Sequence, residues 1–386
     1  MNTPAIIVIG YNRPMALTRL LESLEKAVYP NGINVPLIIS IDKSDSNDTV
    51  EAANAATWTH GTKTVQTYPA NLGLRNHVIK CGDWAAEYGS IIVLEDDLYV
   101  SRGFYEYAVA ALDWTGEDDR IGGVSLYNHL LNVHAREPFE AVNDGYDNWY
   151  FQFASSWGQA YTARQWAQFK EWYAVNCDKR VEGADVPQNV AGWSDKSWLK
   201  YYIKYLIDTN KYFMYPRISY STNFSDAGEH FDKADTDTDV QVPFAMDVMH
   251  RDFLFSSLDE SQAVYDAFFE NVRLPDDEMR SATIVDLYGT KDIGKAIERA
   301  GDFKYILTCK SLPYKVVKAY ARVMRPIDAN VLENVGGHDF YLYDLTQSGP
   351  APHVNEVQRY LYNYRALNAG RMSKILKYRT KSIFKH

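Results

Sequence analysis

The sequence predicts an α/β fold with a doubly wound, mostly parallel sheet and a mixed, largely helical C-terminal extension. Two observations carry this prediction. Over residues 5–219, short apolar runs alternate with segments of helical periodicity, as in βαβ units. The apolar run 91–94 also passes without a turn residue into Glu95, Asp96 and Asp97. Because open α/β sheets bind ligands beyond the carboxyl ends of their strands, this run indicates a buried strand that ends in a site.

The individual elements follow from the spacing of the apolar residues and from residues that begin a helix, such as Pro14. Residues 5–9 read as a first buried strand, and Pro14 begins a helix with its leucines on one face. Further strands are expected at 35–41, 64–67, 91–94, 121–126 and 213–219, and further helices at 74–88, 101–114, 162–173 and 194–209.

The pattern changes at the acidic run 232–239, where the sequence becomes weakly periodic. We therefore divide the chain into residues 1–232, the α/β unit, and residues 233–386, a C-terminal extension. Within the extension, the basic segment 314–324 is the candidate helix. A chain of 386 residues exceeds the usual size of one core, which agrees with this division.

Charge limits the range of partners. The net charge of −10 argues against nucleic acid as a partner. Basic residues nevertheless crowd the C-terminus, where residues 371–385 hold six lysines and arginines and no acid. We expect this tail either to lie on an anionic membrane surface or to be solvated. The absence of a signal peptide and of a transmembrane run, together with three separated cysteines, predicts a cytoplasmic protein.

The three consecutive acids need a partner. Glu95, Asp96 and Asp97 repel one another unless a cation or a ligand hydroxyl neutralises them. Carboxylate oxygens suit Mg2+ or Mn2+, which accept one or two protein carboxylates and complete their shell with substrate phosphates. The alternative is that the acids begin a polar loop or cap the helix expected near Ser101.

An aromatic segment, 146–161, contains Trp157 followed at once by Gly158. Aromatic walls beside a glycine suit a sugar-sized pocket. Core packing is the competing interpretation for each single aromatic, because such side chains are mostly buried for their area.

Four motifs follow successive strands in order: YNRP at 11–14, Asp42, NLGLR at 71–75, and Glu95-Asp96-Asp97. This set resembles nucleotide-sugar glycosyltransferases of the GT-A fold, a Rossmann-like, doubly wound architecture. Within that superfamily it is most similar to the family-2-like bacterial enzymes and to the N-acetylglucosaminyltransferase I group. The resemblance covers residues 4–231 and leaves the remainder unmatched.

The resemblance implies roles for individual residues. Asp97 would hold Mn2+ or Mg2+, with His230 as a second metal ligand. Six residues are expected to bind the donor. Arg13 and Asp42 would line the pocket of the nucleotide base, Asp96 would lie near the ribose and diphosphate, and Trp157 and Gly158 would shape the sugar site. Glu95 is the sixth donor-binding residue. Glu-Asp-Asp differs from the commoner Asp-x-Asp, which affects the role of Asp96 more than that of Asp97.

The resemblance also makes Asp195 the general base. Ser194 is the expected N-cap of the next helix, so the helix dipole should keep Asp195 ionised. An ordinary first-turn acid is the competing interpretation, and Glu229 is an alternative base. Simple structural roles also compete for Arg13, which could pair with a surface acid, for Asp42, which could cap a turn, and for His230.

The expected activity is a metal-dependent glycosyltransferase. It would move a hexose or N-acetylhexosamine, with inversion, from a nucleoside diphosphate, UDP above all, to a glycan or lipid-linked oligosaccharide. Bacterial capsule or O-antigen synthesis is the expected setting. A sugar nucleotidyltransferase should show a glycine-rich basic loop after the first strand, whereas Gly10 stands alone. A carbohydrate-binding protein without turnover is the third alternative.

Overall fold

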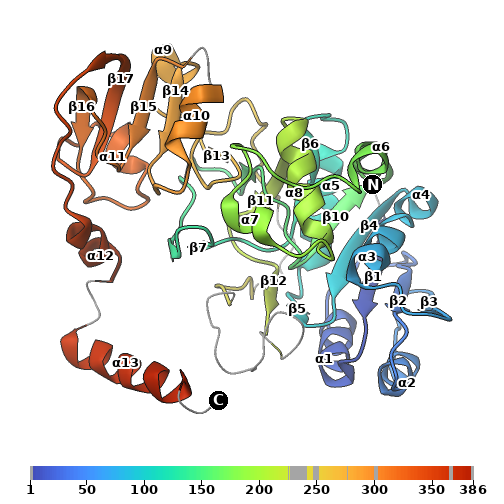
Figure 1. The fold of residues 1–386 in the computed structure, drawn as a ribbon. Coiled ribbons are helices and arrows are strands. Elements are labelled where there is room, and N and C mark those ends of the chain that lie inside the picture. The colour runs from blue at the N-terminus through green and yellow to red at the C-terminus, as the bar shows by residue number, and fades with distance from the viewer. Residues whose placement is uncertain are drawn as a thin grey trace.

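The structure is a computed structural model that describes residues 3–224, 226, 241–246, 252–275, 277–299, 303–364 and 368–383. Figure 1 shows a large α/β part, a smaller sheet near it, and a C-terminal helix that stands apart. The strands of the large sheet are β1 (Ala5–Gly10), β2 (Leu37–Ile41), β3 (Lys63–Thr67), β4 (Ser90–Glu95), β6 (Ile121–Ser125), β9 (Asn148–Phe151), β10 (Gln159–Thr162), β11 (Tyr212–Pro216) and β13 (Val264–Tyr265). Their order in the sheet is β13-β9-β11-β6-β10-β4-β1-β2-β3.

The predicted mostly parallel sheet is confirmed. Strands β3, β2, β1 and β4 run parallel, and the antiparallel β10 lies between β4 and β6. Every residue of β1 and β2 is buried, which is why these strands read as unbroken apolar runs.

Helices cover both faces of this sheet. Alternate residues of β1 point to opposite faces, so Ile6 and Val8 join one core while Ile7 and Ile9 join the other. On the first face pack α1 (Pro14–Glu25), α2 (Asp48–Ala55) and α5 (Phe104–Thr115). On the second face pack α3 (Leu74–Gly82), α6 (Ala163–Asn176) and α8 (Trp198–Asp208), and α7 (Gln188–Gly192) lies beside them. The doubly wound class is therefore confirmed.

Several local expectations need correction. The helix expected at 74–88 is two helices, α3 and α4 (Ala85–Tyr88). Gly82, the last residue of α3, packs so closely on Trp166 that a Cβ there would lie 1.9 Å from the indole. Neither α2 nor the short antiparallel pair of strands β5 (Leu98–Val100) and β12 (Ser221–Asn223) was predicted. The helix expected at 194–209 begins only at Trp198, with Ser197 as its N-cap.

The C-terminal extension contains a four-stranded sheet as well as helices. Its strands are β14 (Thr283–Asp286), β15 (Tyr305–Thr308), β16 (Tyr314–Tyr320) and β17 (Phe340–Ser348), in the order β14-β15-β17-β16. The helices are α9 (Asp277–Arg280), α10 (Ile293–Arg299), α11 (Ala329–Leu332), α12 (Glu356–Tyr364) and α13 (Ala369–Ile383). The helix predicted at 314–324 is wrong, because tyrosines and paired valines favour the strand β16 over a helix.

The expected division at residue 232 lies outside the described residues. Because β13 pairs with β9 at the edge of the large sheet, the pairing favours a later division, after Pro275. We retain a two-part chain as a proposal. Within the described part of the chain, no helix combines the length and the apolar character needed to cross a membrane.

Buried acids join the two sheets. Glu270, which is 1% exposed, accepts hydrogen bonds from the backbone N–H groups of Leu287 and Tyr288, both at 2.8 Å. On the hairpin of β7 (Leu131–Asn132) and β8 (Glu137–Pro138), the Glu137 carboxylate pairs with Arg359 of α12. These contacts fix the smaller sheet and α12 against the larger part.

Candidate functional site

The predicted acidic triplet lies at the carboxyl end of the central strand β4. The neighbouring strand β1 ends at the same edge and leads into Arg13, directly before α1. The Arg13 guanidinium spans two of the acids: Nη1 donates to Asp97 Oδ2 at 3.0 Å, and Nη2 donates to Asp96 Oδ1. The structure therefore brings together Arg13, Glu95, Asp96 and Asp97 and makes Arg13 a partner of the acids.

Burial dominates the electrostatics of the triplet. Asp96 is 3% exposed, and burial raises its pKa to about 6 although Arg13 opposes the shift. Burial and the charge of Asp97 raise the pKa of Glu95 to about 8, while the Trp198 side chain hydrogen-bonds to it. For Arg13, burial alone would lower the pKa, but the two aspartates outweigh it and raise the pKa. The site holds more negative charge than Arg13 neutralises.

One carboxylate oxygen of Asp97 accepts no hydrogen bond in the described structure. Its Oδ1 is buried and has no hydrogen-bond partner among the described residues, although its other carboxylate oxygen pairs with Arg13. An unpartnered buried carboxylate oxygen is costly unless a ligand occupies it. The backbone carbonyl of Asp97 accepts a hydrogen bond from Phe224 N at 3.2 Å, so the segment after β12 passes beside the triplet. His230, further along this segment, lies outside the described residues.

The donor set fits a divalent cation held by one protein carboxylate. No group of three His, Cys, Asp or Glu converges as a metal site among the residues that the structure describes. A complete protein cage is not required, because Mg2+ and Mn2+ commonly use one or two carboxylates together with substrate phosphates. Asp97 Oδ1 supplies the first such oxygen.

Asp42 has a structural role in addition to any ligand role. It is 4% exposed, and its carboxylate accepts hydrogen bonds from Leu72 N at 2.9 Å and Gly73 N at 3.0 Å. Asp42 thereby ties the loop 71–73 to the end of β2. This role resembles the turn-capping role that was the structural alternative for Asp42. Its contact with a nucleotide base stays a prediction.

Trp157 and Gly158 lie between β12 and the aromatic core. The Trp157 ring centroid is 4.6 Å from that of Tyr127 and 5.6 Å from that of His129. The aromatics of the preceding strand are core residues, since Trp149 and Phe151 are 0% exposed. The pocket interpretation therefore stays open for Trp157, which is partly exposed.

His129 is a residue that the sequence did not identify. Burial, followed by the proximity of His134, lowers its pKa to about 3, so the ring is neutral at physiological pH. Its Nε2 has no hydrogen-bond partner in the described part of the protein. A lone histidine carries no local signal in sequence, and only the fold reveals its position beside Trp157.

Gly158 provides a direct stability test. Its φ is +96°, and a Cβ there would lie 2.9 Å from Ser221 Oγ and 3.2 Å from Leu126 Cβ. We expect Gly158→Ala to lower the free energy of unfolding by about 2–3 kcal/mol. Gly145, with φ +91° and no atom within 4 Å of a Cβ, is the matched control, and its alanine variant should lose only about 1 kcal/mol. Equal losses in urea denaturation would contradict the proposed close contact.

Asp195 departs from the expected helix position. It lies before the N-cap Ser197, and its side chain is 79% exposed. A hydrogen bond from Lys200 Nζ at 3.0 Å, rather than the helix dipole, lowers the pKa of Asp195. Trp198, three residues later, contacts Glu95, so the loop carrying Asp195 adjoins the triplet. The assignment of Asp195 as the base stays a prediction.

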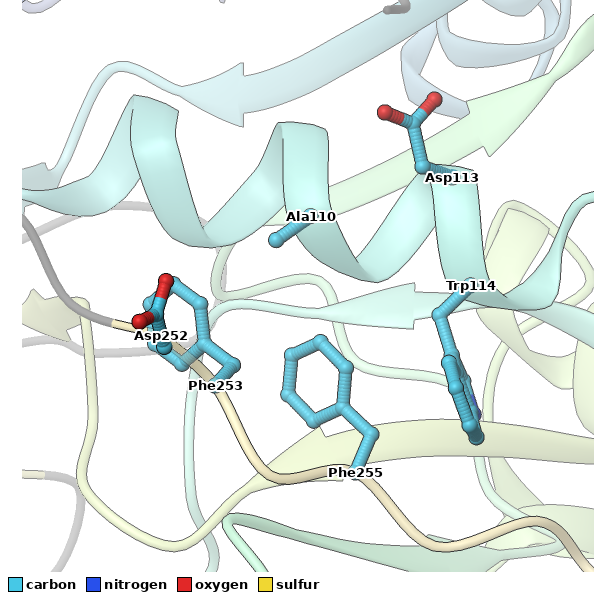
Figure 2. Close-up of a pocket in the computed structure, with 6 residues that line it drawn as sticks. All are labelled: Ala110, Asp113, Trp114, Asp252, Phe253 and Phe255. Carbon is cyan, nitrogen blue, oxygen red and sulfur yellow. The ribbon is translucent and has the colours of Figure 1, made fainter.

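A shallow surface hollow lies away from the triplet. Figure 2 shows it against α5, lined by Ala110, Asp113, Trp114, Asp252, Phe253 and Phe255, with a volume of about 430 Å³. At about 1.5 Å per residue along α5, Trp114 lies on the order of 15 Å from Phe104, the end nearer the triplet. This hollow contains neither the triplet nor any other predicted site residue. The candidate functional site is therefore located by its charged groups, the acidic triplet and Arg13.

Comparison with known proteins gives the following. No family model matches the sequence, and no curated protein is similar to it in sequence. Among solved structures, the chain is similar to a mannosyltransferase, PcManGT, from Pyrobaculum calidifontis in complex with GDP-Man and Mn2+, at 14% identity over 45% of this chain and 47% of that chain, with a TM-score of 0.33.

Two further structures are similar at the same level. TarS from S. aureus in complex with UDP-GlcNAc has 15% identity over 59% of this chain and 60% of that chain, with a TM-score of 0.38. A cytidylyltransferase from Leptospira borgpetersenii has 13% identity over 44% of this chain and 65% of that chain, with a TM-score of 0.28. In each case the chain spans less than two thirds of the length of the protein that it matches.

Proposed function

We propose that the protein is a nucleotide-sugar glycosyltransferase whose donor binds at the carboxyl ends of β1 and β4. The observation that supports this most is the pair of buried aspartates at the end of β4, of which Asp97 has an unpartnered oxygen in the described structure. Such a group is suited to a cation and a diphosphate. The ordered motifs after β1, β2, β3 and β4 support the same assignment.

The proposed chemistry assigns a task to each group. Asp97 would hold Mn2+ or Mg2+, and the cation would supply charge neutralisation for the departing nucleoside diphosphate. Asp195 would accept the proton of the acceptor hydroxyl as that oxygen bonds to the anomeric carbon and the bond to the diphosphate breaks. A single displacement of this kind inverts the anomeric configuration. Asp96, Glu95 and Arg13 would orient the donor, and Trp157 would cover its sugar.

The same proposal includes the identity of the donor and acceptor, the biological setting and the second metal ligand. We propose a UDP-linked hexose or N-acetylhexosamine as the donor and a glycan or lipid-linked oligosaccharide as the acceptor. The proposed setting is bacterial surface polysaccharide synthesis at the cytoplasmic face of the membrane. His230 would add a second metal ligand. The relation to the N-acetylglucosaminyltransferase I group stays a prediction.

Product analysis tests the proposal. The protein is incubated with UDP-, GDP- or TDP-linked sugars, with and without Mn2+, and the nucleotide products are separated by liquid chromatography and mass spectrometry. Release of a nucleoside diphosphate from one donor supports the proposal. In a second incubation with a nucleoside triphosphate and a sugar 1-phosphate, pyrophosphate formation would instead indicate the nucleotidyltransferase. Donor binding without any product would indicate a carbohydrate-binding protein.

Arg13 offers a separate test of the charge balance. We expect Arg13→Gln to destabilise the metal-free protein by about 1–2 kcal/mol, because Asp96 and Asp97 lose their cation, with partial exposure limiting the loss. Mn2+ should then raise the melting temperature more than it does in the wild type. Arg120→Gln is the matched control, since Arg120 also bridges two aspartates but directly precedes β6, at the sheet edge opposite the triplet. Equal Mn2+ responses in thermal denaturation of both variants would contradict this charge balance.

A further inference from the structure

The C-terminal helix α13 exposes an apolar stripe. Met372, Ile375 and Leu376 are 50%, 44% and 62% exposed. Their spacing of three and four residues places them on one face of the helix. All residues from 369 to 377 are exposed, so this face has no cover in the described structure.

The opposite side of α13 is basic. Arg371, Lys374 and Lys377 are exposed there, and helical spacing places them away from the apolar stripe. Residues 368–386 contain six lysines and arginines and no aspartate or glutamate. The helix is thus amphipathic with a cationic polar face, in a chain whose net charge is −10.

Helix α12 is tied to the protein body, whereas α13 shows no such tie among the side chains that the structure describes. Arg359 of α12 donates to the carbonyl of Tyr288 at 2.7 Å, and the Tyr364 hydroxyl donates to the carbonyl of Arg136 at 3.0 Å. The hydrogen bonds of the described residues of α13 are local, such as those from Arg371 N to Asn368 Oδ1 at 3.0 Å and from Thr380 Oγ1 to the Leu376 carbonyl at 2.9 Å. Figure 1 shows α13 beyond α12, apart from both sheets.

An amphipathic helix of this kind needs a surface to cover it. Most helical stability in proteins comes from packing of the apolar face, which α13 lacks among the described residues. A stripe of Met, Ile and Leu opposite Lys and Arg matches a helix lying in the interface of an anionic bilayer. A second copy of α13 fits less well, because its cationic face would be repelled. We propose that α13 binds the surface of an anionic phospholipid membrane, independently of the activity proposed above.

Vesicle sedimentation of the full chain tests this proposal. We expect the wild type to sediment with vesicles of phosphatidylcholine and phosphatidylglycerol, and at least about tenfold less with phosphatidylcholine alone. The charge variant Arg371→Gln/Lys374→Gln/Lys377→Gln should lose about tenfold or more of its binding to the anionic vesicles. The apolar variant Met372→Ser/Ile375→Ser/Leu376→Ser should lose binding likewise, because the stripe no longer inserts.

A matched control carries Lys304→Gln/Lys315→Gln, two exposed lysines of the smaller sheet and its flank, and should bind as the wild type does. All variants should keep the melting temperature of the wild type, since α13 contributes no described contact to the body. Equal binding of the wild type and the charge variant to anionic vesicles would overturn the proposal. A wild type that binds no vesicles but forms a dimer lost in the apolar variant would assign the stripe to a second copy instead.

Discussion

Replacing Asp97 with asparagine should lower donor turnover by about 10³-fold or more while the protein stays folded. The variant keeps the shape of the side chain but removes the negative charge from the unpartnered Oδ1. Loss of a group that stabilises charge on a leaving diphosphate typically costs about this much in rate. Arg13 retains Asp96 as a partner, which limits the structural effect.

Initial rates of nucleoside diphosphate release, with circular dichroism on the same samples, measure this effect. Asp45→Asn is the matched control, because Asp45 is an exposed acid in the loop after β2 and lies outside the proposed site. The control should turn over donor at the wild-type rate. A folded Asp97→Asn protein with wild-type turnover would remove Asp97 from the chemistry.

A second large effect concerns Asp328, which directly precedes α11 at the joint of the two parts. Asp328 is 2% exposed and accepts a hydrogen bond from the Tyr265 hydroxyl at 3.1 Å. Burial raises the pKa of Asp328 to about 7, from an ordinary value of 3.8. The folded state therefore holds a proton that the unfolded state releases. The corresponding stability is fully present below pH 3.8 and is lost as the pH rises through about 7.

Asp328→Asn should remove this pH dependence, because the amide can still accept from Tyr265 and carries no charge. The variant should match the wild type near pH ~4 and exceed it by up to about 4 kcal/mol near pH ~8, the equivalent of three pKa units. Urea denaturation at both pH values measures the difference. Asp45→Asn should follow the wild type at both. A variant no more stable than the wild type at the higher pH would contradict the buried, protonated state.

The features readable from sequence are those set by local chemistry. Buried parallel strands read as apolar runs, so β1, β2 and β4 and the acids after β4 were predictable. The helix α1 was equally clear, because Pro14 and its leucines mark both its start and its buried face. These elements determine the fold class and the edge where the candidate site lies.

The remaining features depend on contacts between distant segments. Arg13 was expected at a nucleotide base, but pairing with Asp96 and Asp97 requires β1 and β4 to be neighbours. Ser194 was the expected N-cap of α8, whereas the observed N-cap is Ser197. The two serines offer equivalent caps, so sequence alone does not choose between them. The paired valines of β16, with a lysine on either side, gave a basic pattern that suits a helix or an edge strand, and only its pairing with β17 decides between them.

The most direct test of the account is a measurement of Mn2+ binding with and without nucleotide. The electron paramagnetic resonance signal of free Mn2+ reports how much of the metal is bound. Because the described site offers one free carboxylate oxygen, at Asp97, the account predicts weak Mn2+ binding by the protein alone and strong binding once UDP supplies phosphate oxygens. Asp97→Asn should abolish that gain. Mn2+ binding that UDP does not strengthen, or that survives in Asp97→Asn, would contradict a nucleotide-sugar site at the end of β4.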